Sequence, residues 1–265
     1  MASKESLGKT LGVVVGVCLV CSIVVSVAAV GLRPTQQANA LLDKQKNILA
    51  VSGLEIGSQK MADVFAKNIE PRLVDLKTGE YVDVKDVEGV SDINEYDPLK
   101  AAKEPEKSTK LSPEQAIAGF STRENIGLVY LVNSDAGELE RVIVPVRGAG
   151  LWNMMYAFVA IQPDGNTVDG ITYYQQGETP GLGGEVENPM WKALWPGKKL
   201  YDEQGNPAIK IVKGGAAEGD VHGVDGLSGA TLTGTGIQHT FDFWLSTDGY
   251  GSYLKKLGKG ELNNG

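Results

Sequence analysis

The chain has 265 residues, and its 42% of hydrophobic and 22% of charged residues are typical of a globular protein, which excludes a disordered or collagen-like chain. Its formal net charge of −8 predicts that nucleic acid is not a partner. With two cysteines and two histidines, the chain alone cannot build a disulfide scaffold, a cysteine-ligated iron–sulfur cluster or a three-histidine metal site.

Residues 1–10 are predicted to be an N-terminal tail, and residues 11–32 a transmembrane helix. The 23 residues 10–32 carry no charge, and as a helix they would span roughly 35 Å, against roughly 30 Å for the hydrocarbon core of a bilayer. This apolar run is longer than the roughly 7–15 residues of a signal-peptide core, so we expect an uncleaved anchor in the lipid bilayer. Lysine and arginine are nearly balanced on its two sides, so charge alone leaves the orientation open.

Cys18 and Cys21 lie within this predicted span, three residues apart and therefore on one helix face. Two interpretations stay open: a redox or metal pair shared with another membrane subunit, or two small residues that pack against a neighbouring helix. The span itself has no charged residue, so it gives no sign of a sodium path.

Residues 33–113 are predicted to be a helical and acidic connecting region. Apolar residues recur at helical spacing between residues 36 and 76, whereas residues 77–113 are rich in aspartate, glutamate and lysine. The acidic residues lack the spacing of an EF-hand calcium loop. We therefore expect helix up to Leu76, followed by a solvated, mobile connector.

The remaining residues, 114–265, are predicted to form the functional domain. Short runs rich in valine, isoleucine, leucine and tyrosine are separated by turn sequences, which predicts strands joined as antiparallel neighbours. Helices are predicted near residues 184–194 and at residues 236–245. The predicted strands are residues 128–132, 141–146, 153–161, 168–174 and 208–212. The expected fold class is α+β: a mainly antiparallel sheet with flanking helices, after a single N-terminal transmembrane helix.

A loop of small and hydroxyl-bearing residues precedes the last of these helices. It reads Asp225-Gly226-Leu227-Ser228-Gly229-Ala230-Thr231. Free backbone N–H groups and the positive end of the following helix suit an anion there, most naturally a phosphate. The residues alone also allow a plain helix entry capped by Thr235. No Gly-Lys-Ser/Thr closes the loop, which excludes a Walker A motif.

The stretch from Asp225 to Thr231 resembles the acceptor motif of proteins that carry FMN covalently, as a phosphoester on the last threonine. The resemblance implies that a flavin transferase, using FAD and Mg²⁺, attaches FMN to Thr231, with Thr233 the next candidate acceptor. A hydroxyl on a flexible loop suits this role, because the transferase can supply the general base. The other motif residues implied to contact the cofactor are Asp225, Ser228, Gly229 and Ala230.

Two further glycine-rich segments resemble parts of FMN-binding domains that lie against the flavin. They read Gly148-Ala149-Gly150-Leu151-Trp152 and Glu178-Thr179-Pro180-Gly181-Leu182-Gly183. From the residues alone, both are turns, the first followed by a core Leu-Trp pair. The resemblance implies instead that Leu151 and Trp152 shield the flavin ring and that Lys213 is a cation near it. It also implies contacts to the ring or the ribityl chain from Glu178, Thr179, Leu182 and Gly183.

Taken in order after a predicted anchor, these segments resemble the C subunits of bacterial sodium-translocating NADH:quinone oxidoreductases. The resemblance covers the anchor and residues 120–250. It implies a membrane-anchored flavoprotein that relays electrons among other membrane subunits, in the bacterial inner membrane, with its flavin domain on the periplasmic side. No Gly-x-Gly-x-x-Gly follows a predicted strand, so NADH is expected to bind a partner subunit. No catalytic or metal-ligating residue is predicted.

Two alternatives stay open from the sequence. The G subunits of Rnf electron-transport complexes carry the same threonyl-FMN motif, although Rnf subunits tend to be shorter than this chain. A membrane-tethered binding or assembly module would hold no redox cofactor and would therefore lack a covalently bound yellow chromophore. A hydrolase is disfavoured, because the chain has no Gly-x-Ser-x-Gly elbow.

Overall fold

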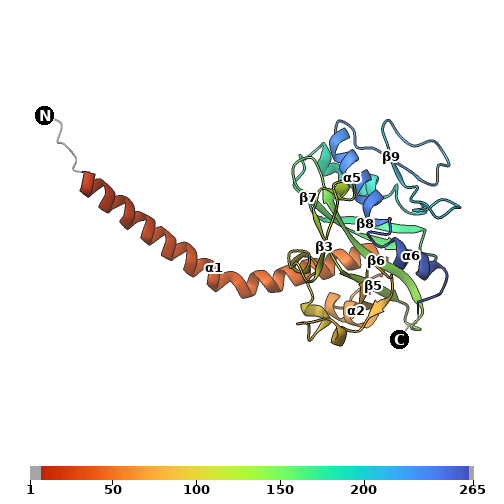
Figure 1. The fold of residues 1–265 in the computed structure, drawn as a ribbon, viewed down its shortest axis with the longest axis horizontal. Coiled ribbons are helices and arrows are strands. Elements are labelled where there is room, and N and C mark those ends of the chain that lie inside the picture. The colour runs from red at the N-terminus through yellow and green to blue at the C-terminus, as the bar shows by residue number, and fades with distance from the viewer. Residues whose placement is uncertain (1–6, 263–265) are drawn as a thin grey trace. The chain divides into compact units, whose positions relative to one another are not determined.

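The computed structural model describes residues 7–262 and divides the chain into two compact units, Met1–Gln45 and Lys46–Gly265. The described part of the first unit lies in the long helix α1 (Leu7–Ser52), drawn in red to orange in Figure 1. The most apolar stretch of α1 has a mean hydropathy of 2.9, and none of it is buried inside the protein. Among the described residues, α1 is the one helix long and apolar enough to cross a bilayer, in agreement with a membrane anchor.

The second unit is built around a six-stranded sheet in the order β2-β1-β5-β6-β7-β8, in which every neighbouring pair is antiparallel. β-Branched and aromatic residues are frequent in its strands, because they pack well on a pleated surface. The strands are β1 (Ile69–Asp75), β2 (Tyr81–Val82), β5 (Ile126–Asn133), β6 (Leu139–Ala149), β7 (Met154–Ile161) and β8 (Val168–Gln175). The predicted α+β fold with a mainly antiparallel sheet is confirmed (Figure 1).

Both faces of this sheet are covered by apolar side chains. Along β5, successive residues alternate between two cores, so that Leu131 packs into one and Tyr130 into the other. The helices α5 (Thr231–Trp244) and α6 (Gly251–Gly258) contribute to the first core, whereas the end of α1 and α2 (Met61–Asn68) contribute to the second. Burial on two sides explains why these strands read as nearly continuous apolar runs in the sequence.

Shorter elements connect the strands and helices. The strands β9 and β10, which come before α5 in the chain, pair in parallel. Strand β3 pairs with β4 in the antiparallel sense. These elements are η1 (Val84–Asp86), η2 (Ile93–Glu95), α3 (Pro98–Ala101), β3 (Ser108–Lys110), η3 (Ala116–Ala118), β4 (Thr122–Glu124), η4 (Gly183–Glu187), α4 (Pro189–Lys192), β9 (Lys210–Val212) and β10 (Gly223–Asp225).

The helix predicted up to Leu76 is confirmed in α1 and α2 but is wrong for the break after Ser52 and from Ile69 onward. After Ser52 the chain forms the separate helix α2, and residues 69–75 are then strand β1, an inner strand of the sheet. In the antiparallel register, Ile69 stands opposite Val132 on β5. Pairing with a distant strand therefore overrides the local helical spacing of the apolar residues.

Residues 77–113 do not form the solvated connector that their charges predicted. Tyr96 is buried, and its hydroxyl donates a hydrogen bond to the Ile126 carbonyl oxygen at 2.6 Å. Ala101 and Leu111 are buried as well. Because β2 also lies in the six-stranded sheet, this region is part of the same compact unit as the strands that follow it.

Two helices differ in extent from their predictions. The helix expected near residues 184–194 is divided into η4 and α4, because Asn188 caps α4 and Pro189 begins it. The Asn188 side chain accepts a hydrogen bond from the Met190 backbone N–H at 2.9 Å. The helix expected from residue 236 begins earlier, at Thr231, which places the predicted acceptor in its first turn.

Candidate functional site

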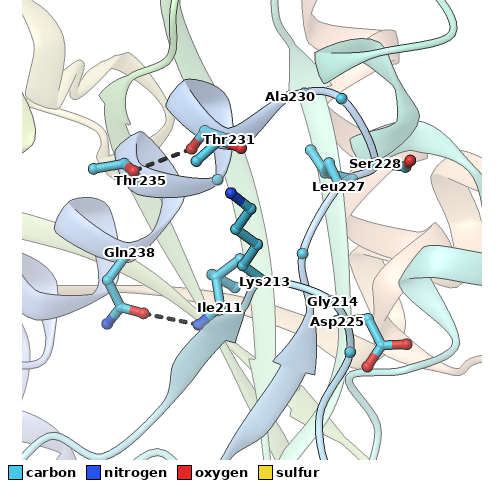
Figure 2. A pocket seen from close by; sticks show the side chains of 14 residues that line it. Ile211, Lys213, Gly214, Asp225, Leu227, Ser228, Ala230, Thr231, Thr235 and Gln238 are labelled. Atoms are coloured by element: carbon cyan, nitrogen blue, oxygen red, sulfur yellow. Dashed lines mark hydrogen bonds between the residues drawn. The ribbon is translucent and has the colours of Figure 1, made fainter.

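A cavity of about 570 Å³ lies between the end of β9 and the first turns of α5 (Figure 2). It is lined by residues 211 and 213–215, by the whole segment 225–231, and by residues 234, 235 and 238 of α5. The predicted acceptor loop therefore lines a cavity, together with the first turns of α5 and the segment after β9. The Gly226 N–H, at the start of the loop, donates to the Val212 carbonyl oxygen at 2.8 Å.

The N-terminus of α5 opens onto this cavity. Ala230 occupies the N-cap position without a side-chain hydrogen bond, so the alternative of a cap by Thr235 is wrong. The Thr235 hydroxyl instead donates to the Thr231 carbonyl oxygen at 3.0 Å, as Figure 2 shows. The first N–H groups of a helix have no carbonyl partner within it and carry its positive end. The exposed Thr231 therefore stands where an anionic group is stabilised.

Glycines let α5 approach the end of β6 closely. A Cβ atom at Gly236 would clash with the Ala149 carbonyl oxygen, and a Cβ atom at Gly148 would clash with the Thr240 hydroxyl. Glycine and threonine are weak helix formers, so local propensity disfavours a helix that begins at Thr231. The close packing against β6 therefore holds the part of α5 from Gly236 onward.

A buried carboxylate joins the three glycine-rich segments. Glu178 is 5% exposed, and its oxygens accept hydrogen bonds from the backbone N–H groups of Leu151 and Trp152, at 3.1 and 2.9 Å. The hydroxyl of Thr233, in the first turn of α5, donates to the same carboxylate at 2.5 Å. The turn after β6, the loop after β8 and the start of α5 therefore meet at one side chain.

These surroundings favour the ionised form of Glu178. Burial by itself raises the pKa of the carboxyl group, but hydrogen bonds from Thr233 and from the backbone of residues 151–153 outweigh it and bring the pKa below its ordinary value of 4.5. Both carboxylate oxygens face donors of the protein itself. The expectation that Glu178 offers its polar atoms to the flavin is therefore not what its hydrogen bonds indicate.

Of the residues predicted to hold the cofactor, one group lines the cavity. Lys213 extends across it with its amino group directed toward Thr231 (Figure 2). The Asp225 carboxylate points away from Thr231 in the same view and accepts a hydrogen bond from the Ala216 backbone N–H at 2.8 Å. Asp225 therefore shapes the loop after β9. The other members of this group are Ser228, Gly229, Ala230 and Thr231.

The second group lies outside the cavity lining. The side chains of Leu151, Trp152 and Leu182 are 46%, 66% and 42% exposed, so the alternative of a core Leu-Trp pair is wrong. Leu182 borders the acceptor loop, because a Cβ atom at Gly229 would lie 2.9 Å from its Cδ2 atom. Thr179 is exposed, and its carbonyl oxygen accepts from the N–H groups of residues 182 and 184. The remaining member, Gly183, is buried beside the Glu178 carboxylate.

Several residues of the site were not predicted. Gln238 accepts a hydrogen bond from the Ile211 backbone N–H at 2.8 Å and donates to the Ile209 carbonyl oxygen at 3.0 Å, so it joins α5 to β9. Its position seven residues after Thr231, on the same helix face, was the available signal. The partnership of Thr233 with Glu178 had no such signal. The other unpredicted lining residues are Ile211, Gly214, Gly215, Gly226, Leu227, Gly234 and Thr235.

Comparison with known proteins adds a family model and close relatives. A model described as the FMN-binding domain matches residues 150–246, which contain all the residues that line the cavity. A Vibrio campbellii protein, named as the C subunit of a Na(+)-translocating NADH-quinone reductase, is 59% identical over 262 residues, covering 99% of each chain. A protein of the same name from Yersinia pestis is 53% identical over 266 residues, covering 99% of this chain and 97% of that protein.

A solved structure is also similar. The crystal structure of Shewanella oneidensis NqrC has a TM-score of 0.75 and 39% sequence identity, and the match covers 82% of this chain and 97% of that one. The relatives share the chain's full length, and the solved structure shares its fold. The names of these relatives agree with the first of the two families that the sequence resembles. The chain belongs to the family of Na(+)-translocating NADH-quinone reductase C subunits.

Proposed function

We propose that this chain is the flavin-carrying electron-relay subunit of a Na⁺-translocating NADH:quinone reductase, with FMN joined covalently through its phosphate to Thr231. The observation that carries the proposal is the position of the Thr231 hydroxyl, exposed at the uncapped N-terminus of α5 and on the wall of a cavity. When bound, FMN supplies the ability to accept and release electrons.

The residues of the cavity fit an FMN phosphate. The volume of the cavity, about 570 Å³, lies within the roughly 300–1,000 Å³ of typical ligand pockets. The first N–H groups of α5 lack partners within the helix and favour negative charge. The Lys213 amino group, directed toward Thr231, adds a positive charge at the same end of the cavity (Figure 2). We therefore assign Lys213 to the phosphate rather than to the ring.

In this proposal the cofactor is attached by transfer of the FMN phosphoryl group from FAD to Thr231. The Thr231 oxygen forms a bond to the phosphorus atom of the FMN half, and the phosphoanhydride bond of FAD breaks. AMP leaves, and the threonine proton passes to a base on the flavin transferase. No base within this chain is required, which suits a threonine surrounded by small residues.

The remaining predicted residues divide by role. Ser228, Gly229 and Ala230 give the acceptor a loop through which backbone N–H groups reach the phosphate. Leu151, Trp152 and Leu182 are exposed apolar side chains that exclude water from a flavin ring placed beside the cavity. Residues proposed to act through the backbone that they bind or approach are Asp225, Glu178, Thr179 and Gly183.

The relay function places the chain in a membrane complex. In this proposal residues 1–10, of which 1–6 lie outside the described residues, are a tail, and residues 11–32 cross the inner membrane. The compact unit Lys46–Gly265, which includes most of the region expected to connect, holds the flavin on the periplasmic side. Other membrane subunits of the reductase are the electron donors and acceptors, and the flavin transferase is a partner during maturation. The unburied apolar stretch of α1 supports the membrane span, and the family of the chain supports its place in the reductase.

In-gel fluorescence tests the attachment. The full chain, produced together with a flavin transferase, is expected to give a fluorescent band on a denaturing gel, because a phosphoester survives denaturation. Thr231→Val is expected to give a dark band, whereas Thr231→Ser, which keeps a hydroxyl, is expected to fluoresce. A fluorescent Thr231→Val band would contradict the choice of acceptor, and a dark wild-type band would favour a binding module without cofactor.

A further inference from the structure

The Glu178–Thr233 hydrogen bond lies outside the cavity lining, and Thr233 is two residues after the proposed attachment point at Thr231. We propose that this pair is a positioning device, which fixes the exposed Leu151–Trp152 turn relative to the attachment point at Thr231. The inference rests on the proposed attachment of FMN to Thr231. It assigns to Thr233 a role different from that of an alternative acceptor.

The two threonines of the first turn of α5 face opposite directions. Residues two apart on a helix are separated by roughly 200° around its axis. Thr231 is exposed at the cavity, whereas Thr233 is 1% exposed and donates its hydroxyl hydrogen to the Glu178 carboxylate at 2.5 Å. The buried Thr233 is therefore out of reach of a transferase. One turn of helix thus presents an acceptor on one face and a structural donor on the other.

The same carboxylate holds the backbone of the exposed turn. Glu178 accepts from the N–H groups of Leu151 and Trp152, whose side chains are largely exposed. Hydrogen bonds to a charged acceptor are stronger than neutral ones, and a buried charge that loses a donor is destabilised. The position of this turn is therefore set by hydrogen bonds to Glu178 more than by the burial of its own side chains.

The packing around the pair leaves it no room to adjust. A Cβ atom at Gly150 would lie 2.5 Å from the Glu178 Oε1 atom. A Cβ atom at Gly183 would lie 2.6 Å from the Thr233 Oγ1 atom and 2.8 Å from the Glu178 Oε2 atom. Gly150 and Gly183, on two different segments, thus pack closely against the carboxylate and the hydroxyl. A change at Thr233 is expected to be transmitted to the Leu151–Trp152 turn rather than absorbed locally.

The test uses three variants of the full chain loaded with flavin by co-expression. Thr233→Val removes the hydroxyl at nearly constant shape, Thr233→Ser restores it, and Thr240→Val makes the same isosteric change elsewhere on α5. Thr240 is buried, donates to the Gly236 carbonyl oxygen at 2.8 Å and packs against Gly148 at the end of β6. It therefore controls for the loss of a buried hydroxyl that touches the same segment but donates to Gly236 rather than to Glu178. The readouts are in-gel fluorescence, the visible circular dichroism of the flavin and its reduction potential.

The expected result separates attachment from positioning. Thr233→Val is expected to keep its fluorescent band but to lose at least half of the flavin circular dichroism and to shift the potential. Thr233→Ser is expected to match the wild type, as is Thr240→Val. The inference is overturned if Thr233→Val keeps the wild-type spectrum and potential, if Thr240→Val produces the same change, or if Thr233→Ser fails to rescue. A dark Thr233→Val band beside a bright wild-type band would also overturn it.

A second measurement works without flavin. In the unflavinylated full chain, Thr233→Val is expected to speed hydrogen exchange of the Leu151 and Trp152 amides about tenfold relative to Thr240→Val. Unchanged exchange would overturn the positioning role even if FMN attachment were confirmed. If the wild type proved dark on the gel, this readout would still decide the role of the pair while the proposed function failed. Should Thr233→Val not fold, Glu178→Gln takes its place, because its amide NH₂ would face one of the same donors.

Discussion

At the scale of single residues, the site depends on which groups face the cavity and which face the protein. Thr231 and Glu178 belong to segments that the sequence links to a flavin, yet only the threonine is exposed to the cavity. The carboxylate is surrounded by donors of the chain itself, and its proximity to the site is what the sequence pattern detected. The motifs thus identify residues near the site, whereas the hydrogen bonds show which of them face the cavity and which face the protein.

The ionisation of Glu178 predicts a pH dependence of stability. Its pKa in the folded chain lies below the ordinary 4.5, so its contribution to stability is fully present above the unfolded pKa and is lost as the pH falls through the folded value. The difference in unfolding free energy between the wild type and Glu178→Gln is therefore expected to be constant from about pH 7 to about pH 5 and to shrink in more acidic solution. Urea denaturation across this range measures it. A difference that grows on acidification would contradict the assignment.

Sequence reasoning found the acceptor more readily than its support, for a physical reason. Asp225 to Thr231 is one contiguous segment, so its composition carries the signal. Glu178 and Thr233 are 55 residues apart, and nothing local to either predicts their hydrogen bond. The same holds for Gln238 and Ile209, which are joined only when α5 packs beside β9.

At the scale of elements, the predictions succeeded where burial is two-sided and failed where pairing is distant. Strands β5–β8 follow one another through short turns, and their apolar runs identify them directly. Strand β1 interrupts its apolar residues with Glu70, Pro71 and Arg72, and its partner β5 comes 50 or more residues later. Helix α5 begins with residues of low helix propensity, where the buried Thr233 is bonded to the distant Glu178, and its later part packs against β6.

The contact between α5 and β6 predicts opposite effects for two glycines. Replacing glycine by alanine inside a helix ordinarily stabilises by about 0.5–1 kcal/mol. Gly234→Ala is expected to follow this rule, because its Cβ atom would meet the Ile211 side chain at an ordinary 3.5 Å. Gly236→Ala is expected to destabilise by roughly 1–3 kcal/mol, because its Cβ atom would clash with the Ala149 carbonyl oxygen. Urea denaturation midpoints compare the two, and a gain of stability in both variants would contradict the close approach.

At the scale of the whole molecule, helix α1 contains residues of both units. Its apolar part lies in the first unit, whereas its last residues belong to the second, where Ile48, Leu49 and Val51 are buried in the core. The last residues of α1 are therefore part of the second unit and not of a solvated connector. The sequence predicted the apolar span from its length and lack of charge, but the burial of residues 48–51 depends on contacts with strands more distant in the chain.

This arrangement predicts where the chain tolerates truncation. A chain of residues 46–265 is expected to fold and to stay soluble without detergent, because it retains the complete second unit. A chain of residues 53–265 loses Ile48, Leu49 and Val51 from the core and is expected to be less stable by roughly 3 kcal/mol or more. Denaturation curves of the two truncations decide the matter. Equal stabilities would show that the end of α1 does not belong to the core.

The most direct test of the central claim is mass spectrometry of the full chain after co-expression with a flavin transferase. We expect the mass of the chain to rise by that of FMN less one water, and fragmentation to place the added group on Thr231. Thr231→Val processed in parallel is expected to show the mass of the unmodified chain. An unmodified wild-type chain, or FMN found on Thr233 or any other residue, would contradict the account.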